Sequence, residues 1–116
     1  MHEFSIAISI IESVEKEAKV ANAESISSVT LDIGTMAGIE YYALDTAMEM
    51  AVKDTMLQDC EIVVNKIQAH AVCSDCGHDF EIENAVDQCP KCSSFFNEII
   101  SGKELKIKSI VIEENG

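Results

Sequence analysis

The sequence predicts an α+β fold in which a small sheet of about three strands carries two helices and an inserted zinc-ribbon module. Two Cys-x-x-Cys pairs, Cys73 with Cys76 and Cys89 with Cys92, are separated by twelve residues. Apolar residues recur at helical spacing in two segments, and alternating apolar and polar residues mark several strands. Because the cysteine pairs stand before the last strand, the ribbon is expected to be an insertion into the core.

Two amphipathic helices are expected, over residues 4–22 and 40–53, separated by a strand and a turn over 34–38. Each has one apolar face and one polar face. The first inner face comprises Ala7, Ile10, Ile11, Val14, Ala18 and Ala21. The second comprises Tyr41, Leu44, Met48, Ala51 and Val52.

Strands are expected over residues 27–34, 61–72, 95–100 and 104–112. Period-two alternation supports the first, and the second runs directly into Cys73. In the last strand the apolar residues change phase at Ser109, which predicts a bulge or a strand covered on both faces.

The position of the cysteines divides the chain into two predicted domains. Residues 1–72 and 101–116 form the α+β domain, which contains the N-terminal metal-binding candidates described below. Residues 73–100 form the zinc-binding ribbon domain. This division follows from the ribbon's insertion between two strands of the core.

The charge of the chain narrows the class of partner. Twenty-one acidic residues against eight lysines and no arginine give a net charge of −13. Within 73–100 the only basic side chain is Lys91. Nucleic-acid binding needs basic surface to neutralise phosphates, so it is not expected. No apolar run reaches the length of a membrane span, and the chain is expected to be cytoplasmic.

The four paired cysteines predict a structural zinc site. Four thiolates complete a tetrahedral shell and leave no position for substrate water, so the zinc is expected to be structural. Two disulfides, a redox dithiol and an iron centre are the alternatives. No basic segment followed by an apolar run marks the chain as secreted, and a redox dithiol needs only one pair. Cys60 stands apart and is expected to be a buried thiol.

The first residues offer a second kind of metal site. The Met1 amine, the His2 backbone nitrogen and the His2 imidazole Nδ1 can close two chelate rings of little strain around one ion. Planar nitrogen donors favour Ni(II) or Cu(II), and Glu3 can add a carboxylate or its own amide nitrogen. Because these donors lose protons on binding, affinity should rise with pH. The alternative is an ordinary exposed terminal histidine.

The combination of these motifs resembles the HypA/HybF family of nickel-incorporation proteins for [NiFe]-hydrogenase maturation. The start Met1-His2-Glu3 is joined to the two cysteine pairs and to a strand that ends in Ile33-Gly34. The final motif is Leu105-x-Ile107-x-x-Ile110-x-Ile112. The resemblance covers essentially the whole chain.

The resemblance implies specific ligands. His2 would be the essential nickel ligand, assisted by the Met1 amine and by Glu3. Glu40 is the nearest match to an acidic residue that some members place near nickel. Cys73, Cys76, Cys89 and Cys92 would hold structural zinc, and the nickel would be transferable.

The resemblance also implies partners. They are a HypB-type GTPase and the [NiFe]-hydrogenase large-subunit precursor. The chain itself would act as a monomer or homodimer. The chain itself lacks a Gly-x-x-x-x-Gly-Lys-Ser/Thr phosphate loop and is expected not to be an enzyme. Two rival classes are a zinc-ribbon protein-interaction module without nickel transfer and a thiol oxidoreductase that uses one cysteine pair.

Overall fold

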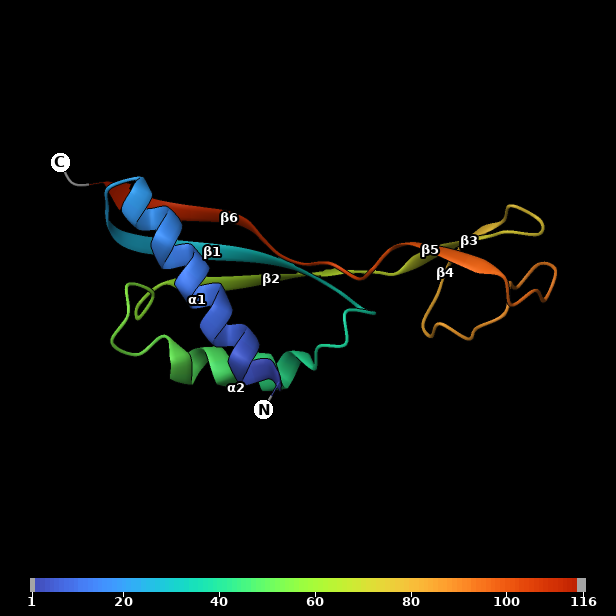
Figure 1. The fold of residues 1–116 in the computed structure, drawn as a ribbon, viewed down its shortest axis with the longest axis horizontal. Coiled ribbons are helices and arrows are strands. Elements are labelled where there is room, and N and C mark those ends of the chain that lie inside the picture. Colours follow the sequence, from blue (N-terminus) through green and yellow to red (C-terminus); the bar gives the residue numbers. More distant parts are fainter. Residues whose placement is uncertain (1, 115–116) are drawn as a thin grey trace. The chain divides into compact units, whose positions relative to one another are not determined.

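The computed structural model describes residues 2–114 and confirms an α+β fold with two helices and small three-stranded sheets (Figure 1). In chain order the elements are α1 (His2–Val20), β1 (Ala23–Gly34), α2 (Tyr41–Ala51), β2 (Glu61–Ile67), β3 (His70–Cys73), β4 (Asp79–Glu81), β5 (Asn97–Ser101) and β6 (Leu105–Glu114). One sheet has the order β2-β1-β6 and the other has the order β4-β3-β5.

The chain forms two compact units. The helical unit contains the described residues up to Leu31, then Ile39–Val64, then the segment from Ile107. The ribbon unit contains Asp32–Gly38 and Asn65–Lys106. The division predicted from the sequence, into a nickel-binding and a zinc-binding domain, is defined by metal binding, which these compact units do not test. It stays a prediction.

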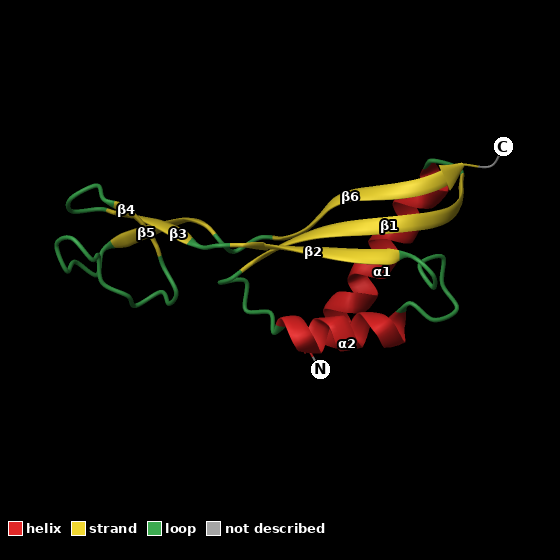
Figure 2. Ribbon diagram, turned by 180° about the vertical axis from the view of Figure 1, so that it is seen from behind, coloured by secondary structure: helices red, strands yellow, loops and turns green. Residues whose placement is uncertain are grey.

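The helical unit is built on the apolar face of α1. Five of the six expected inner residues are buried, and α1 ends at Val20, so Ala21 is exposed in the turn that follows. Asn22 takes a left-handed conformation with φ of 56°, which ends the helix before β1. Figure 2 shows both helices on one face of the sheet that contains β1.

Helix α2 begins at a side-chain cap. Glu40 accepts hydrogen bonds from the backbone N–H groups of Tyr42 (3.2 Å) and Ala43 (2.7 Å), which satisfies two donors that the first helical turn leaves unpaired. Leu44 and Met48 are buried as expected, and Ala47 joins them.

The ribbon unit has its own small core around β3. Strand β3 pairs antiparallel with both β4 and β5. Ala69, Ala71 and Ile82 are buried together, and Met36, Phe80 and Ile99 pack against them. The unit therefore has apolar packing besides its cysteines.

The expected strand over 61–72 is divided into β2 and β3. At the break, the Ala69 N–H donates to Thr35 Oγ1 (3.0 Å), and the Ala69 carbonyl accepts from the Ile82 N–H (3.0 Å). These two bonds redirect the backbone. The strand β4 has no counterpart among the expected elements, because it is a three-residue segment formed by pairing with β3.

In β6 the half-buried positions shift from an odd residue number before Ser109 to even residue numbers after it, as the predicted change of phase implies. Ile107, Ile110 and Ile112 are half-buried, whereas Ser109 is exposed. β1 also starts four residues earlier than expected, at Ala23. Over residues 2–114, neither helix combines the length and the apolar character needed to cross a membrane.

Candidate metal centres

The two cysteine pairs meet in the ribbon unit. Each of the four residues offers one Sγ atom, and these atoms lie within 4.8 Å of one another. Cys73 lies 3.5 Å from Cys92 and Cys76 lies 3.7 Å from Cys89, measured between sulfurs. Zinc–thiolate bonds of about 2.3 Å in a tetrahedron require sulfurs about 3.8 Å apart. The quartet therefore fits a tetrahedral zinc ion, and all four thiols are free of disulfides.

The two pairs are built as equivalent turns. The Gly77 N–H donates to the Cys73 carbonyl, and the Ser93 N–H donates to the Cys89 carbonyl, both at 2.8 Å. Four residues after the first cysteine of each pair, Gly77 and Ser93 take left-handed conformations with φ of 77° and 65°. The first turn therefore holds a glycine in the left-handed conformation, whereas the second turn holds a serine there.

The sulfurs differ in environment. Cys73 and Cys89 are buried, and Cys76 and Cys92 are exposed. The pKa of the Cys73 thiol is lowered to about 7, chiefly because the Cys76 N–H donates to its sulfur. A lowered pKa favours the thiolate, which is the form of cysteine that binds metal.

A side-chain bridge joins the two turns. The Ser94 hydroxyl donates to the Asp75 carboxylate and accepts from the Phe96 N–H at 3.0 Å. The Ser74 N–H donates to the Phe96 carbonyl at 2.7 Å. Sequence reasoning missed this link, because Asp75 and Ser94 are nineteen residues apart.

The two remaining described histidines of the chain lie outside the sulfur quartet. The Nδ1 atom of His70 is 3.4 Å from the Asp79 carboxylate, across the β3–β4 pair. The ring of His78 stacks on Phe80, with centroids 6.0 Å apart. His70 thus contacts a residue of the paired strand, and His78 lies in the loop before β4.

Of the candidate nickel residues, His2 and Glu3 lie at the start of α1 and Glu40 precedes α2, whereas Met1 is outside the described residues. His2 is exposed and begins the helix, and Glu3 follows it in the first turn. The first N–H groups of a helix have no partner within it, so the His2 amide nitrogen is not required by the helix ladder. His2 is therefore an exposed residue at a position where the helix does not use the backbone N–H.

Glu3 and Glu40 are brought together. The Glu3 carboxylate accepts a hydrogen bond from the Glu40 N–H at 3.4 Å, although 37 residues separate them. The pKa of Glu3 is lowered because its own N–H and the Glu40 N–H stabilise the carboxylate. The two oxygens of Glu40 are engaged in capping α2. Glu40 therefore has a structural role that sequence reasoning missed.

Comparison with known proteins gives a consistent result. Residues 1–112 match the family model described as hydrogenase/urease nickel incorporation, metallochaperone, hypA. A hydrogenase maturation factor HypA from Chlorobium limicola is 42% identical over 114 residues, which is 98% of both chains. One from Parabacteroides distasonis is 39% identical and covers 98% of this chain and 99% of the relative.

Two solved structures share the fold. A solution structure of HypA protein has a TM-score of 0.71 at 28% identity, covering 99% of this chain and 98% of that one. The solution structure of the Ni metallochaperone HypA from Helicobacter pylori has a TM-score of 0.69 at 24% identity, covering 97% and 98%.

Proposed function

The chain belongs to the HypA family of nickel-incorporation metallochaperones for hydrogenase maturation, and we propose that it binds Ni(II) at its N-terminus and hands the ion on to a [NiFe]-hydrogenase. The ligands we propose are the Met1 amine and the His2 nitrogens, with Glu3 or its amide nitrogen adjacent. The observation that carries the proposal is that His2 lies exposed in the first turn of α1, where the helix itself provides no acceptors for the backbone N–H groups.

A site of this kind suits a carrier. Its donors come from consecutive residues, and His2 is exposed, so a partner could approach and exchange them. An affinity in the micromolar range, about −8 kcal/mol, would hold the ion and still release it. The four sulfurs of the ribbon unit, two of them buried, suit a permanent ion instead.

We propose that the ribbon cysteines hold structural Zn²⁺. The support is the chemistry of the donor set, four thiols with sulfur separations that match a tetrahedron around zinc. Bound zinc would tie the turn after β3 to the turn before β5. Its role would be to order the ribbon and not to activate water.

Glu40 has the weakest support as a nickel ligand. Its carboxylate caps α2, and a metal ion would have to displace those N–H groups. Its contact with Glu3 still keeps it near the helix that bears His2. We propose it as an outer neighbour of the nickel that can become a ligand only when the cap opens.

The partners we propose are a HypB-type GTPase and the hydrogenase large-subunit precursor, met in the cytoplasm by a monomer or homodimer. The sequence has no phosphate-binding loop of its own, which favours a separate GTPase. The net charge of −13 argues against nucleic acid and against anionic membrane surfaces. The chain would act as a carrier and not as an enzyme.

Nickel titration of untagged protein with Met1 intact tests the proposal. We expect His2→Ala to lose stoichiometric Ni(II) binding while keeping one zinc ion per chain. A peptide fused ahead of Met1 should have the same effect, because it converts the amine into an amide. Wild-type nickel binding in His2→Ala would contradict the proposal and favour the alternative, a zinc-ribbon interaction module. Redox-active ribbon thiols without firmly held zinc would indicate an oxidoreductase.

A further inference from the structure

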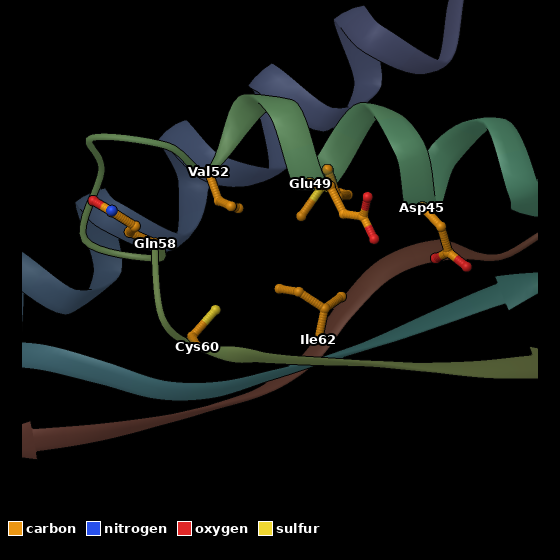
Figure 3. Close-up of a pocket in the computed structure, with 7 residues that line it drawn as sticks. Asp45, Glu49, Val52, Gln58, Cys60 and Ile62 are labelled. Carbon is orange, nitrogen blue, oxygen red and sulfur yellow. The ribbon is translucent and has the colours of Figure 1, made fainter.

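A cavity of about 420 Å³ lies in the helical unit between α2 and the start of β2 (Figure 3). Asp45, Met48, Glu49 and Val52 line it from the helix side. Cys60 and Ile62 line it from the strand side, and Gln58 lies on the segment between them. None of these residues belongs to the candidate metal centres.

The cavity combines an apolar interior with an acidic edge. Met48 is only 3% exposed, and Val52, Cys60 and Ile62 are half-buried. Asp45 and Glu49 are exposed and stand one helical turn apart, on the same side of α2 (Figure 3). Burial raises the pKa of the Cys60 thiol, which agrees with a weakly hydrated interior. Such a cavity suits a side chain with an apolar stem and a cationic end.

The strand beside the cavity is an edge strand. Among the described residues, β2 is at one end of the sheet order β2-β1-β6, so one of its sides has no neighbouring strand. Its sequence from Ile62 to Val64 is a run of β-branched residues, and such edges pair readily with extended chains. A helix flanking an edge strand forms the groove used in recognition by strand addition.

Charge decides which kind of chain fits this edge. Between 41 and 62 there are five carboxylates, those of Asp45, Glu49, Asp54, Asp59 and Glu61, against the single cation of Lys53. A second copy of this chain would also carry a net charge of −13, so pairing through β2 would be opposed by repulsion. The other edge strand, β6, carries Lys106 and Lys108 together with Glu113 and Glu114, so it lacks the acidic excess found beside β2.

We propose that an extended segment of a partner protein pairs with the free edge of β2 and places a lysine or arginine side chain in the cavity between α2 and β2. The backbone pairing would supply affinity, and Asp45 with Glu49 would select the basic side chain. This site is separate from the nickel and zinc ligands. It can therefore be tested in nickel-free protein, and its failure would leave the proposed nickel function untouched.

The probe is a blocked seven-residue peptide of alternating valine and lysine, added to ¹⁵N-labelled, zinc-loaded, nickel-free protein. We expect saturable amide shifts at Cys60–Val64 and at Asp45 and Glu49, with affinity that falls as salt is raised. Two further peptides serve as controls, one with glutamate in place of lysine and one N-methylated at alternate residues. Binding by either control as strong as that of the probe would overturn the proposal.

Matched protein variants distinguish peptide binding at this cavity from non-specific attraction of a basic peptide to an acidic protein. Asp45→Asn with Glu49→Gln should weaken the peptide about tenfold, which corresponds to about 1.4 kcal/mol. Glu12→Gln with Glu17→Gln removes the same charge from exposed positions of α1 and should change affinity less than twofold. Equal losses in the two double variants would refute the site.

Two remaining measurements complete the test. The His2→Ala variant should bind the peptide like the wild type, since His2 is not part of the cavity. Sedimentation equilibrium of peptide-free protein should give the same association constant for wild type and for the Asp45/Glu49 variant. A dimer that weakens or strengthens in this variant would assign the β2 edge to a second copy and overturn the proposed occupant.

Discussion

Gly34 and Gly102 lie backbone against backbone in the ribbon unit. The position that a Cβ atom would take on Gly34 is filled by the carbonyl group of Gly102. The Cβ of a residue at 102 would in turn overlap Ala69, and Gly102 has φ of 106°. Hydrogen bonds from Gly34 to Glu104 (2.8 Å) and from Met36 to Gly102 (2.7 Å) fix this contact. The segments that contain Gly34, Ala69 and Gly102 approach so closely that no side chain fits between them.

Gly34→Ala should therefore destabilise the protein strongly. The obstructing atoms belong to backbone, which yields less readily than a side chain, so we expect a loss of about 3 kcal/mol in the free energy of unfolding. Gly38→Ala is the matched control, because φ there is 78° and the added Cβ meets open space. Its cost should be about 1 kcal/mol, from the left-handed conformation alone. Urea denaturation of zinc-loaded protein measures both, and equal losses would contradict the close contact.

Replacing Glu40 separates capping from metal binding. Glu40→Ala should cost about 1 kcal/mol of stability, because two N–H groups of α2 lose their acceptor. Glu40→Asn should stay within about 0.5 kcal/mol of wild type, since asparagine is a good N-cap residue. Nickel titration of both variants completes the comparison. If nickel binding weakens alike in both while only the alanine variant loses stability, Glu40 is a ligand. Unchanged nickel binding in Glu40→Asn assigns it the cap alone.

The first ribbon thiol of zinc-free protein should ionise near neutral pH. The pKa of Cys73 is lowered to about 7 from its ordinary value of 9.0. A lowered folded-state pKa stabilises the folded protein above the unfolded pKa, and this contribution is lost as pH falls through 7. Thiolate absorbance near 240 nm should rise with a midpoint near pH 7 in a Cys60→Ala background. The same step should be absent in Cys73→Ser, and its persistence there would refute the assignment.

Zinc retention should depend on the bridge between the two cysteine turns. Ser94→Ala removes the hydroxyl that donates to Asp75 and accepts from the Phe96 N–H. We expect a chelator to remove zinc several times faster from this variant, because the second turn is held less firmly. Ser74→Ala changes the same residue type in the first turn, at an exposed side chain, and should release zinc at the wild-type rate. Identical rates in all three proteins would exclude a role for the bridge.

Periodicity and spacing were sufficient to predict the class of fold. The buried face of α1 is a local property of the sequence and was confirmed. In β1 Leu31 and Ile33 are buried, but Asp32 between them is buried as well, so the alternation is lost at the end of the strand. The meeting of the four sulfurs also followed from spacing, because each Cys-x-x-Cys pair is a self-contained turn.

Features that depend on distant contacts escaped prediction. The break between β2 and β3 arises from Thr35 and Ile82 acting on Ala69, and neither residue is a neighbour in sequence. The contact of Glu3 with Glu40 depends on how α1 packs against α2. Periodicity identifies the face that a helix buries, but it does not say which polar residues meet at its ends.

The half-buried thiol of Cys60 offers a practical reporter. Of the five cysteines, it alone lies outside the sulfur quartet. Once a metal masks the other four, a maleimide dye would attach at a single position, directly in the groove beside α2. Because its pKa is raised, labelling should proceed best under mildly alkaline conditions. A change in the fluorescence of that dye would then report the binding of a peptide beside α2, and no substitution in the sequence would be needed.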